Sequence, residues 1–173
     1  MKRICSLAPI LILVVACQSP TPPAAEEATE AVERYTTTAP EIDAAKAGMT
    51  AYLEEDWDAF RSGYTEDAEI FHNSTSAMTI DETIASLQDD LTAVSSYGWD
   101  DEQYWERIIT DEGEVWVYFW GVWEAQHASS DTQFELPVHI AWQFDESKVI
   151  EEYGLWDNSQ VMLAEMETAG GSQ

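Results

Sequence analysis

The chain beyond residue 40 changes its hydrophobic period about halfway along. Its first part repeats apolar positions every three or four residues, which predicts amphipathic helices. One helix is expected over Ile42–Leu53, and a second follows an N-cap at Asp56. Thr79 and Glu82 form the sequence of a capping box, which predicts the start of a third helix. A short strand, Ala68–His72, is expected between the second and third helices.

The second part of the chain is rich in Val, Ile, Trp and Tyr and is interrupted by polar turns. This pattern predicts strands, with the ranges Tyr104–Thr110, Val115–Ala128, Phe134–Phe144 and Val149–Trp156. Helices followed by an antiparallel meander indicate an α+β fold in which the helices pack on one face of a curved sheet.

Two of these strands differ in how their faces are used. Phe134–Phe144 alternates apolar residues with polar ones such as His139, which predicts one core face and one surface or interface face. Val115–Trp123 is apolar on both faces. Such a strand either lines a central core or contributes to a subunit interface, and in the second case a homodimer is expected.

The net charge of the chain indicates which kinds of binding partner are unfavourable. The 173 residues include 34 Asp and Glu but only seven Lys and Arg, and the formal net charge is −27. The few basic residues are scattered, which disfavours binding to nucleic acid or to anionic lipid through a basic patch. The apolar fraction of 45% is enough for a packed core, so the length indicates one domain with appendages.

The first residues have the pattern of a signal sequence. A basic start and a short apolar run over residues 1–16 precede Cys17, and Ala16–Cys17 resembles the lipobox of bacterial lipoproteins. This predicts a cleaved signal, lipidation of Cys17 and a place in the cell envelope, on the outer membrane facing the periplasm. The alternative is a secreted protein with a free thiol. Residues 17–40 are expected to form a tether, 41–167 the domain and 168–173 a disordered tail.

Three segments carry a resemblance to a known family: Tyr64–His72, Phe144–Ile150 and Tyr153–Asp157. In this order of elements they resemble the SnoaL-like branch of the nuclear transport factor 2-like superfamily. The resemblance implies a cone formed by a curved sheet and helices, around an apolar pocket with a few polar groups. The family includes isomerases, cyclases and dehydratases as well as noncatalytic proteins, so fold alone does not give the function.

The resemblance singles out two candidate catalytic residues. His72 falls where ketosteroid isomerase carries its general base, and an imidazole there could move a proton near neutral pH; the alternative is a hydrogen-bonded residue of the pocket wall. Asp157 matches an acidic position at the end of the last strand, where a raised pKa is expected; the alternative is a helix cap. The isomerase's oxyanion-hole groups are missing, because their positions fall near Gly48 and at Ile140.

Aromatic residues are the remaining candidates for a ligand pocket: Tyr64, Trp116, Tyr118, Trp120, Trp142 and Trp156. They would form a wall for a flat apolar molecule, or else fill the core or a dimer interface. No sequence pattern supports a metal site or a cofactor. The leading hypothesis is a lipid-anchored domain that binds a small apolar or aromatic molecule, with acid–base activity of the isomerase, cyclase or dehydratase kind. The alternative is a noncatalytic envelope module for interaction or dimerisation.

Overall fold

The computed structural model describes residues 33–170. The predicted signal, Cys17 and most of the predicted tether lie outside the described residues. Of the helices in the described part, none has the length and apolar character needed to cross a membrane.

Residues 33–170 contain four helices: α1 (Pro40–Leu53), α2 (Trp57–Ser62), α3 (Ile80–Leu91) and α4 (Ser159–Gly170). The first three confirm the helical pattern. The Asp56 side chain accepts a hydrogen bond from the Ala59 N–H, as an N-cap should. Thr79 and Glu82 form the expected capping box at the start of α3. Helix α4 includes the first three residues of the predicted tail.

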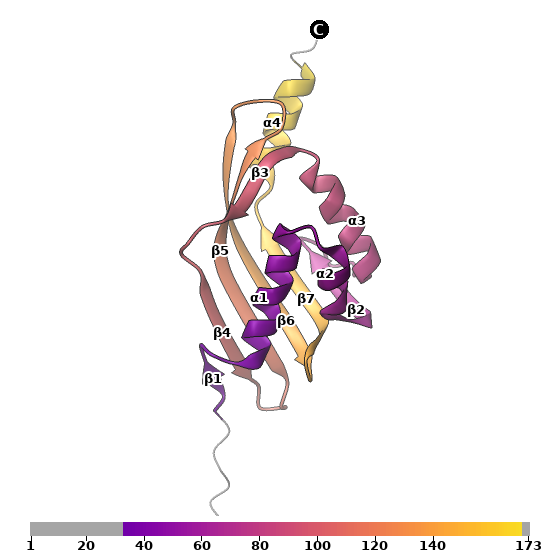
Figure 1. Ribbon diagram of the computed structural model, residues 1–173, viewed down its shortest axis with the longest axis vertical. Coiled ribbons are helices and arrows are strands. Elements are labelled where there is room, and N and C mark those ends of the chain that lie inside the picture. Colours follow the sequence, from indigo (N-terminus) through magenta and orange to yellow (C-terminus); the bar gives the residue numbers. More distant parts are fainter. Residues whose placement is uncertain (1–32, 171–173) are drawn as a thin grey trace, which may run out of the picture. The chain divides into compact units, whose positions relative to one another are not determined.

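In the same described part of the chain, seven strands form one curved, unclosed sheet: β1 (Tyr35–Thr36), β2 (Tyr64–His72), β3 (Val94–Trp99), β4 (Tyr104–Ile109), β5 (Val115–His127), β6 (Gln133–Asp145) and β7 (Lys148–Trp156). The order is β1-β4-β5-β6-β7-β2, and β3 pairs with the far part of β5. Only β2 and β7 run parallel among these described pairs. The helices α1, α2 and α3 lie on one face of the sheet (Figure 1), which confirms the α+β prediction.

Two short strands were not expected from the sequence. Strand β3 contains two serines and a glycine, so its apolar content is too low for a strand signal. Strand β1 lies inside the range predicted as tether, where Tyr35 pairs with Ile108 and Thr36 with Arg107 of β4. Both segments are strands because they pair with a neighbouring strand, and not because their own residues have a strand-like pattern.

The core confirms the alternation predicted for β6. Its apolar residues Phe134, Leu136 and Val138 are buried, whereas Glu135 is exposed. Strand β5 has two different faces. Val117 and Phe119 are fully buried, but Trp120, on the opposite face, is 52% exposed. In the single chain, the second apolar face of β5 is therefore a solvent-facing surface.

Candidate functional site

A cavity of about 600 Å³ lies between the helices and the inner face of the sheet. Its walls include aliphatic side chains such as Met49, Leu136, Val138 and Ile140. Eight aromatic residues also line it: Tyr52, Phe60, Tyr64, Trp99, Trp123, Trp142, Phe144 and Trp156. This size and apolar character are typical of a small-molecule site.

One acidic side chain, that of Glu152, is buried in the wall of this cavity with only 4% of its surface exposed. The register of the sheet brings its partners to it. Trp142 of β6 is its direct cross-strand neighbour, and Ile70 of β2 pairs with it on the other side. Tyr64 and His72 stand at the two ends of β2. The site is therefore built on three adjacent strands of the sheet.

Three side chains hydrogen-bond to the two carboxylate oxygens of Glu152. His72 Nε2 lies 2.7 Å from Oε1, and Trp142 Nε1 donates to Oε2 over 3.0 Å. The Tyr64 hydroxyl also donates to Oε2. A buried carboxylate is costly unless donors satisfy it, and here every oxygen has at least one.

The same cluster controls the charge of Tyr64. Burial, and then the adjacent Glu152 carboxylate, raises the pKa of the Tyr64 phenol well above its usual value. The phenol therefore stays protonated and remains a donor to Glu152. Because Trp142 is also a donor only, the carboxylate is held as the acceptor at the centre of the cluster.

Gly154 makes room for His72. It pairs with His72 across β2 and β7, and a Cβ added at Gly154 would lie 2.8 Å from His72 Cδ2 and 2.7 Å from Trp156 Cζ3. The rings of His72 and Trp156 pack edge to face in this space, with centroids 5.1 Å apart. The absence of a side chain thus fixes where the imidazole sits.

This arrangement gives His72 a defined chemical role. With Nε2 directed at the Glu152 carboxylate, the proton of the neutral imidazole is held on Nε2, and Nδ1 is the basic nitrogen. No residue in the described range 33–170 hydrogen-bonds to Nδ1. A carboxylate that orients an imidazole also stabilises the imidazolium formed when the free nitrogen takes a proton. The pair can therefore accept a proton from a bound molecule and return it.

Further carboxylates stand at the rim of the cavity: Asp89 and Asp90 at the end of α3, and Glu165 in α4. Burial, and then the neighbouring Asp89, raises the pKa of Asp90. Glu165 adds to this rise, whereas His72 opposes it. The rim carboxylates are thus close enough to repel one another and to interact with His72.

The structure brings together four of the residues predicted from the sequence. His72, Tyr64, Trp142 and Trp156 all line the cavity. Tyr64 and Trp142 were expected to contact a ligand as aromatic walls, and they do line the cavity while also donating to Glu152.

Asp157 is placed differently from the prediction. It is exposed, it does not line the large cavity, and its Oδ1 accepts a hydrogen bond of 2.9 Å from the Ser159 N–H at the start of α4. This bond lowers the pKa of Asp157, so the expected raised pKa is wrong. A carboxylate that is exposed to solvent and accepts a hydrogen bond from a backbone N–H is favoured in its ionised form.

The other three predicted aromatic residues lie on the outer face of the sheet. Trp116, Tyr118 and Trp120 are absent from the lining of the large cavity. They stack instead with neighbours on that face: Trp116 with Tyr153, and Trp120 with the imidazole of His139 at 3.8 Å between centroids. Residues of a strand alternate between faces, so they could not share a face with the buried Val117.

Glu152 is the functional candidate that the sequence analysis missed. The signal was present, because Glu152, Gly154 and Trp156 are spaced by two in a predicted strand. If Trp156 faces a pocket, Glu152 must face it too. Glu152 was missed because the chain is rich in Asp and Glu, and a single Glu in such a sequence is expected to be a solvent-exposed charge.

No group of three or more His, Cys, Asp or Glu side chains within residues 33–170 is arranged to hold a metal ion. The site geometry is that of a hydrogen-bonded carboxylate, imidazole, phenol and indole, without a cluster of metal ligands.

No protein-family model matches the sequence, and no curated protein does. Solved structures are similar in fold. One is a protein from Shewanella denitrificans named as a SnoaL-like polyketide cyclase, with 17% identity over 74% of this chain and 97% of that chain and a TM-score of 0.56. Another is a nuclear transport factor 2-like protein of unknown function from Burkholderia pseudomallei, with 13% identity over 73% and 97% of the two chains and a TM-score of 0.58.

A third similar structure is a protein with a ketosteroid isomerase-like fold from Catenulispora acidiphila, solved in complex with trimethylamine. It is 11% identical over 70% of this chain and 90% of that chain, with a TM-score of 0.56. The chain therefore has the fold shared by SnoaL-like and nuclear transport factor 2-like proteins.

Proposed function

We propose that this protein binds a small apolar or aromatic molecule in the central cavity, where His72 and Glu152 act together as an acid–base pair. The observation that carries the proposal is a buried carboxylate holding an imidazole at the wall of a cavity of about 600 Å³. The class of reaction is proton transfer to or from the bound molecule, as in isomerases, cyclases and dehydratases. The fold, shared with SnoaL-like and ketosteroid isomerase-like proteins, supports a small-molecule site.

The energetics of Glu152 argue against a purely structural role. Replacing a buried, hydrogen-bonded ionic group by well-packed apolar residues is often neutral or stabilising. A fold of this kind does not need a carboxylate there, and the wall around it is otherwise largely apolar. A buried carboxylate that is hydrogen-bonded to a histidine in the wall of such a cavity is typical of an active site.

Cavity binding can be tested with N-phenyl-1-naphthylamine, a neutral aromatic dye that fluoresces in apolar surroundings. Gly48 lines the cavity, and a Cβ added there would have nothing within 4 Å, so Gly48→Phe should fill the cavity with little strain. We expect the protein to bind the dye and Gly48→Phe to lose at least about tenfold in affinity. Gly98→Phe, outside the cavity lining, is the matched control and should bind normally. Equal binding by both variants would place the dye elsewhere.

The noncatalytic alternative, dimerisation, is favoured by a different observation. Four residues adjacent across β4–β7 form a row on the outer sheet face: Tyr104, Trp120, His139 and Leu155. The exposed fractions of Tyr104, Trp120 and Leu155 are 65%, 52% and 54%. A contiguous aromatic surface of this kind is typical of an interface. We propose a second copy of this chain as its occupant, because an isologous contact buries the face without leaving it open for polymerisation.

Salt provides the test of this dimer. Each copy carries a formal charge of −27, so screening should strengthen association. Sedimentation equilibrium at micromolar concentration should give a larger dimer fraction at about 500 mM salt than at about 20 mM. A monomer under both conditions would exclude the dimer.

Attachment to the membrane is a further part of the proposal. It rests on the Ala16–Cys17 junction after the short apolar run. Cys17→Ser should abolish lipidation and release the protein from the membrane fraction. An unmodified Cys17 at the mature N-terminus, seen by mass spectrometry of the wild-type protein, would refute lipidation.

A further inference from the structure

The charge of the cavity indicates which kind of molecule it accepts. Building on the cavity-binding function proposed above, we infer that the ligand is a cation: an apolar or aromatic molecule that carries a protonated or quaternary amine. The inference rests on three features of the lining: its aromatic rings, its carboxylates and the place of the basic residues.

The first feature is the aromatic wall. Eight of the lining residues are Phe, Tyr or Trp, and four of them are tryptophans: Trp99, Trp123, Trp142 and Trp156. The face of an aromatic ring attracts a cation, and tryptophan does so most strongly. Aromatic surroundings therefore accept the apolar part of an amine and its charged group alike, whereas an anion gains nothing from the ring faces.

The second feature is an excess of negative charge. Four carboxylates line the cavity: Asp89, Asp90, Glu152 and Glu165. His72 is its one lining group able to become cationic within the described residues, and it is already paired with Glu152. Whether His72 is neutral or protonated, the rim carboxylates keep the cavity negative.

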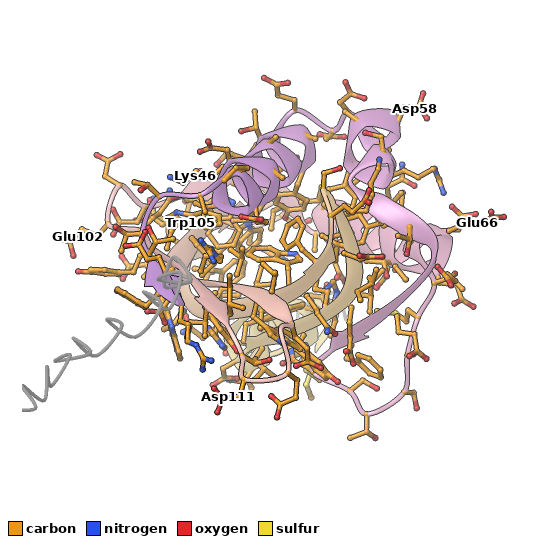
Figure 2. The ribbon with its side chains drawn as sticks, turned by 90° about the horizontal axis from the view of Figure 1, so that it is seen from below. Lys46, Asp58, Glu66, Glu102, Trp105 and Asp111 are labelled. Atoms are coloured by element: carbon orange, nitrogen blue, oxygen red, sulfur yellow. The ribbon has the colours of Figure 1, made fainter. Side chains whose placement is uncertain are left out.

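The third feature is where the basic residues lie. None of the lining residues in the described part of the chain is Lys or Arg. The basic residues of this part each contact another group: Arg34, Lys46, Arg61, Arg107 and Lys148. Lys46, for example, lies over the ring of Trp105, 5.4 Å from its centroid (Figure 2), and neither residue lines the cavity. Among the residues that the structure describes, no lining Lys or Arg is thus present to neutralise the carboxylates at the rim.

The rim has a geometry that an amine would suit. Asp89 and Asp90 are consecutive residues at the end of α3, Glu165 of α4 lines the same cavity, and both neighbours contribute to raising the pKa of Asp90. A cation at the rim would relieve the repulsion among the carboxylates, while its apolar part extends toward Val138 and Ile140. An anion at the rim would meet the same carboxylates unfavourably.

Three probes of one shape separate these cases: phenyltrimethylammonium is cationic, tert-butylbenzene is neutral and benzenesulfonate is anionic. Each would be titrated against bound N-phenyl-1-naphthylamine at about 50 mM salt. We expect the cation to displace the dye at least about tenfold more tightly than the neutral probe, and the anion not to compete.

Because the whole chain is strongly acidic, general attraction of cations must be distinguished from the cavity itself. The test variant neutralises the rim: Asp89→Asn, Asp90→Asn and Glu165→Gln. The matched control removes three exposed charges away from the cavity, Asp58→Asn, Glu66→Gln and Glu102→Gln, which lie at the periphery of Figure 2. The rim variant should lose most of its preference for the cation over the neutral probe, and the control should keep it within about twofold.

The outcomes separate the two proposals. If the dye binds and tert-butylbenzene competes as well as phenyltrimethylammonium, the cationic ligand is wrong and cavity binding remains. Equal loss of preference in the rim and control variants would also overturn the inference, because general attraction would then explain it. If the dye fails to bind the wild-type protein, the proposed cavity-binding function itself is contradicted.

Discussion

The two faces of strands β5, β6 and β7 are made by alternate residues of the same strands. They differ in which side chains they bury and which they expose. The inner face buries a carboxylate, Glu152, against His72 and Trp142. The outer face exposes aromatic and aliphatic side chains, among them Trp120 and Leu155. At these three positions, a fold optimised for stability alone would place an apolar side chain inside and polar ones outside.

This difference indicates that the two faces suit different kinds of partner. On the inner face, the hydrogen bonds of the cluster leave His72 Nδ1 without a partner among residues 33–170, and His72 lines the cavity. On the outer face, large side chains lack a covering layer, which suits a macromolecular partner. Neighbouring residues such as Glu151 and Glu152 show the contrast most clearly, because they point to opposite faces.

The largest effect should come from removing the buried carboxylate. Glu152→Ala leaves the Tyr64 hydroxyl, the Trp142 N–H and His72 without their acceptor, so it should lower the free energy of unfolding by about 3–5 kcal/mol. Glu151→Ala is the matched control on the outer face, where the carboxylate accepts from Tyr153 near solvent. Its cost should stay below about 1 kcal/mol. Urea unfolding measures both, and equal costs would contradict the contrast between the faces.

A charge on the outer face should act on association and not on the cavity. Trp120→Glu places a carboxylate in the centre of the exposed aromatic row and should weaken the dimer by about 2 kcal/mol or more. Met166→Glu alters a more exposed apolar side chain on α4 and should leave association unchanged. Sedimentation gives the dimer dissociation constant. Loss of dye binding in Trp120→Glu, with the dimer intact, would show that the two faces are not separate.

A smaller effect is expected at Gly154, where space and not charge is tested. Gly154→Ala puts a Cβ within 3 Å of the rings of His72 and Trp156, so it should cost about 1–3 kcal/mol in unfolding free energy. The displaced imidazole should also bind the dye less tightly. Gly98→Ala, with nothing within 4 Å of its Cβ, is the control and should be nearly neutral. An unperturbed His72 resonance in Gly154→Ala would disprove the steric role of this glycine.

The smallest effects should be opposite in sign at two aspartates. Because burial and Asp89 raise the pKa of Asp90, its ionised form destabilises the folded protein, so Asp90→Asn should increase stability at pH 7. This gain should vanish below the unfolded pKa of about 3.9. The Ser159 N–H lowers the pKa of Asp157, so this carboxylate contributes stability that is lost as the pH falls through its folded pKa.

Asp157→Asn should therefore decrease stability at pH 7, and this loss too should vanish in acid. Urea unfolding of both variants at pH 7 and at a pH of about 2 measures the signs. Changes in the same direction at pH 7 would contradict the assignment of Asp90 to a repulsive rim and Asp157 to a helix cap.

Local signals in the sequence predicted much of the fold. The capping box at Thr79, the cap at Asp56 and the alternation along β6 are all read from neighbouring residues, and all are confirmed. Strands β1 and β3 were missed because pairing partners far along the chain, and not their own residues, determine them.

The site was predicted only in part for a related reason. His72 lies at the cavity as expected, but its partner is 80 residues away in the chain. The parallel pairing of β2 with β7 brings them together, and no local pattern specifies that register. Trp116 and Trp120 were assigned to the pocket because a strand that is apolar on both faces does not reveal which face is inside.

The most direct test of the central claim is to observe the imidazoles of His72 and His139 while a small molecule binds. These two side chains lie on opposite faces of the sheet, and His139 Nδ1 is hydrogen-bonded to the Phe119 carbonyl. In ¹⁵N spectra of histidine-labelled protein, N-phenyl-1-naphthylamine should shift the His72 ring nitrogens, above all Nδ1, and leave those of His139 unchanged. His72→Ala should then weaken binding by about 1–3 kcal/mol, and His139→Ala should not. Shifts confined to His139, or the opposite ranking of the two variants, would contradict the assignment of the cavity and His72 as the functional site.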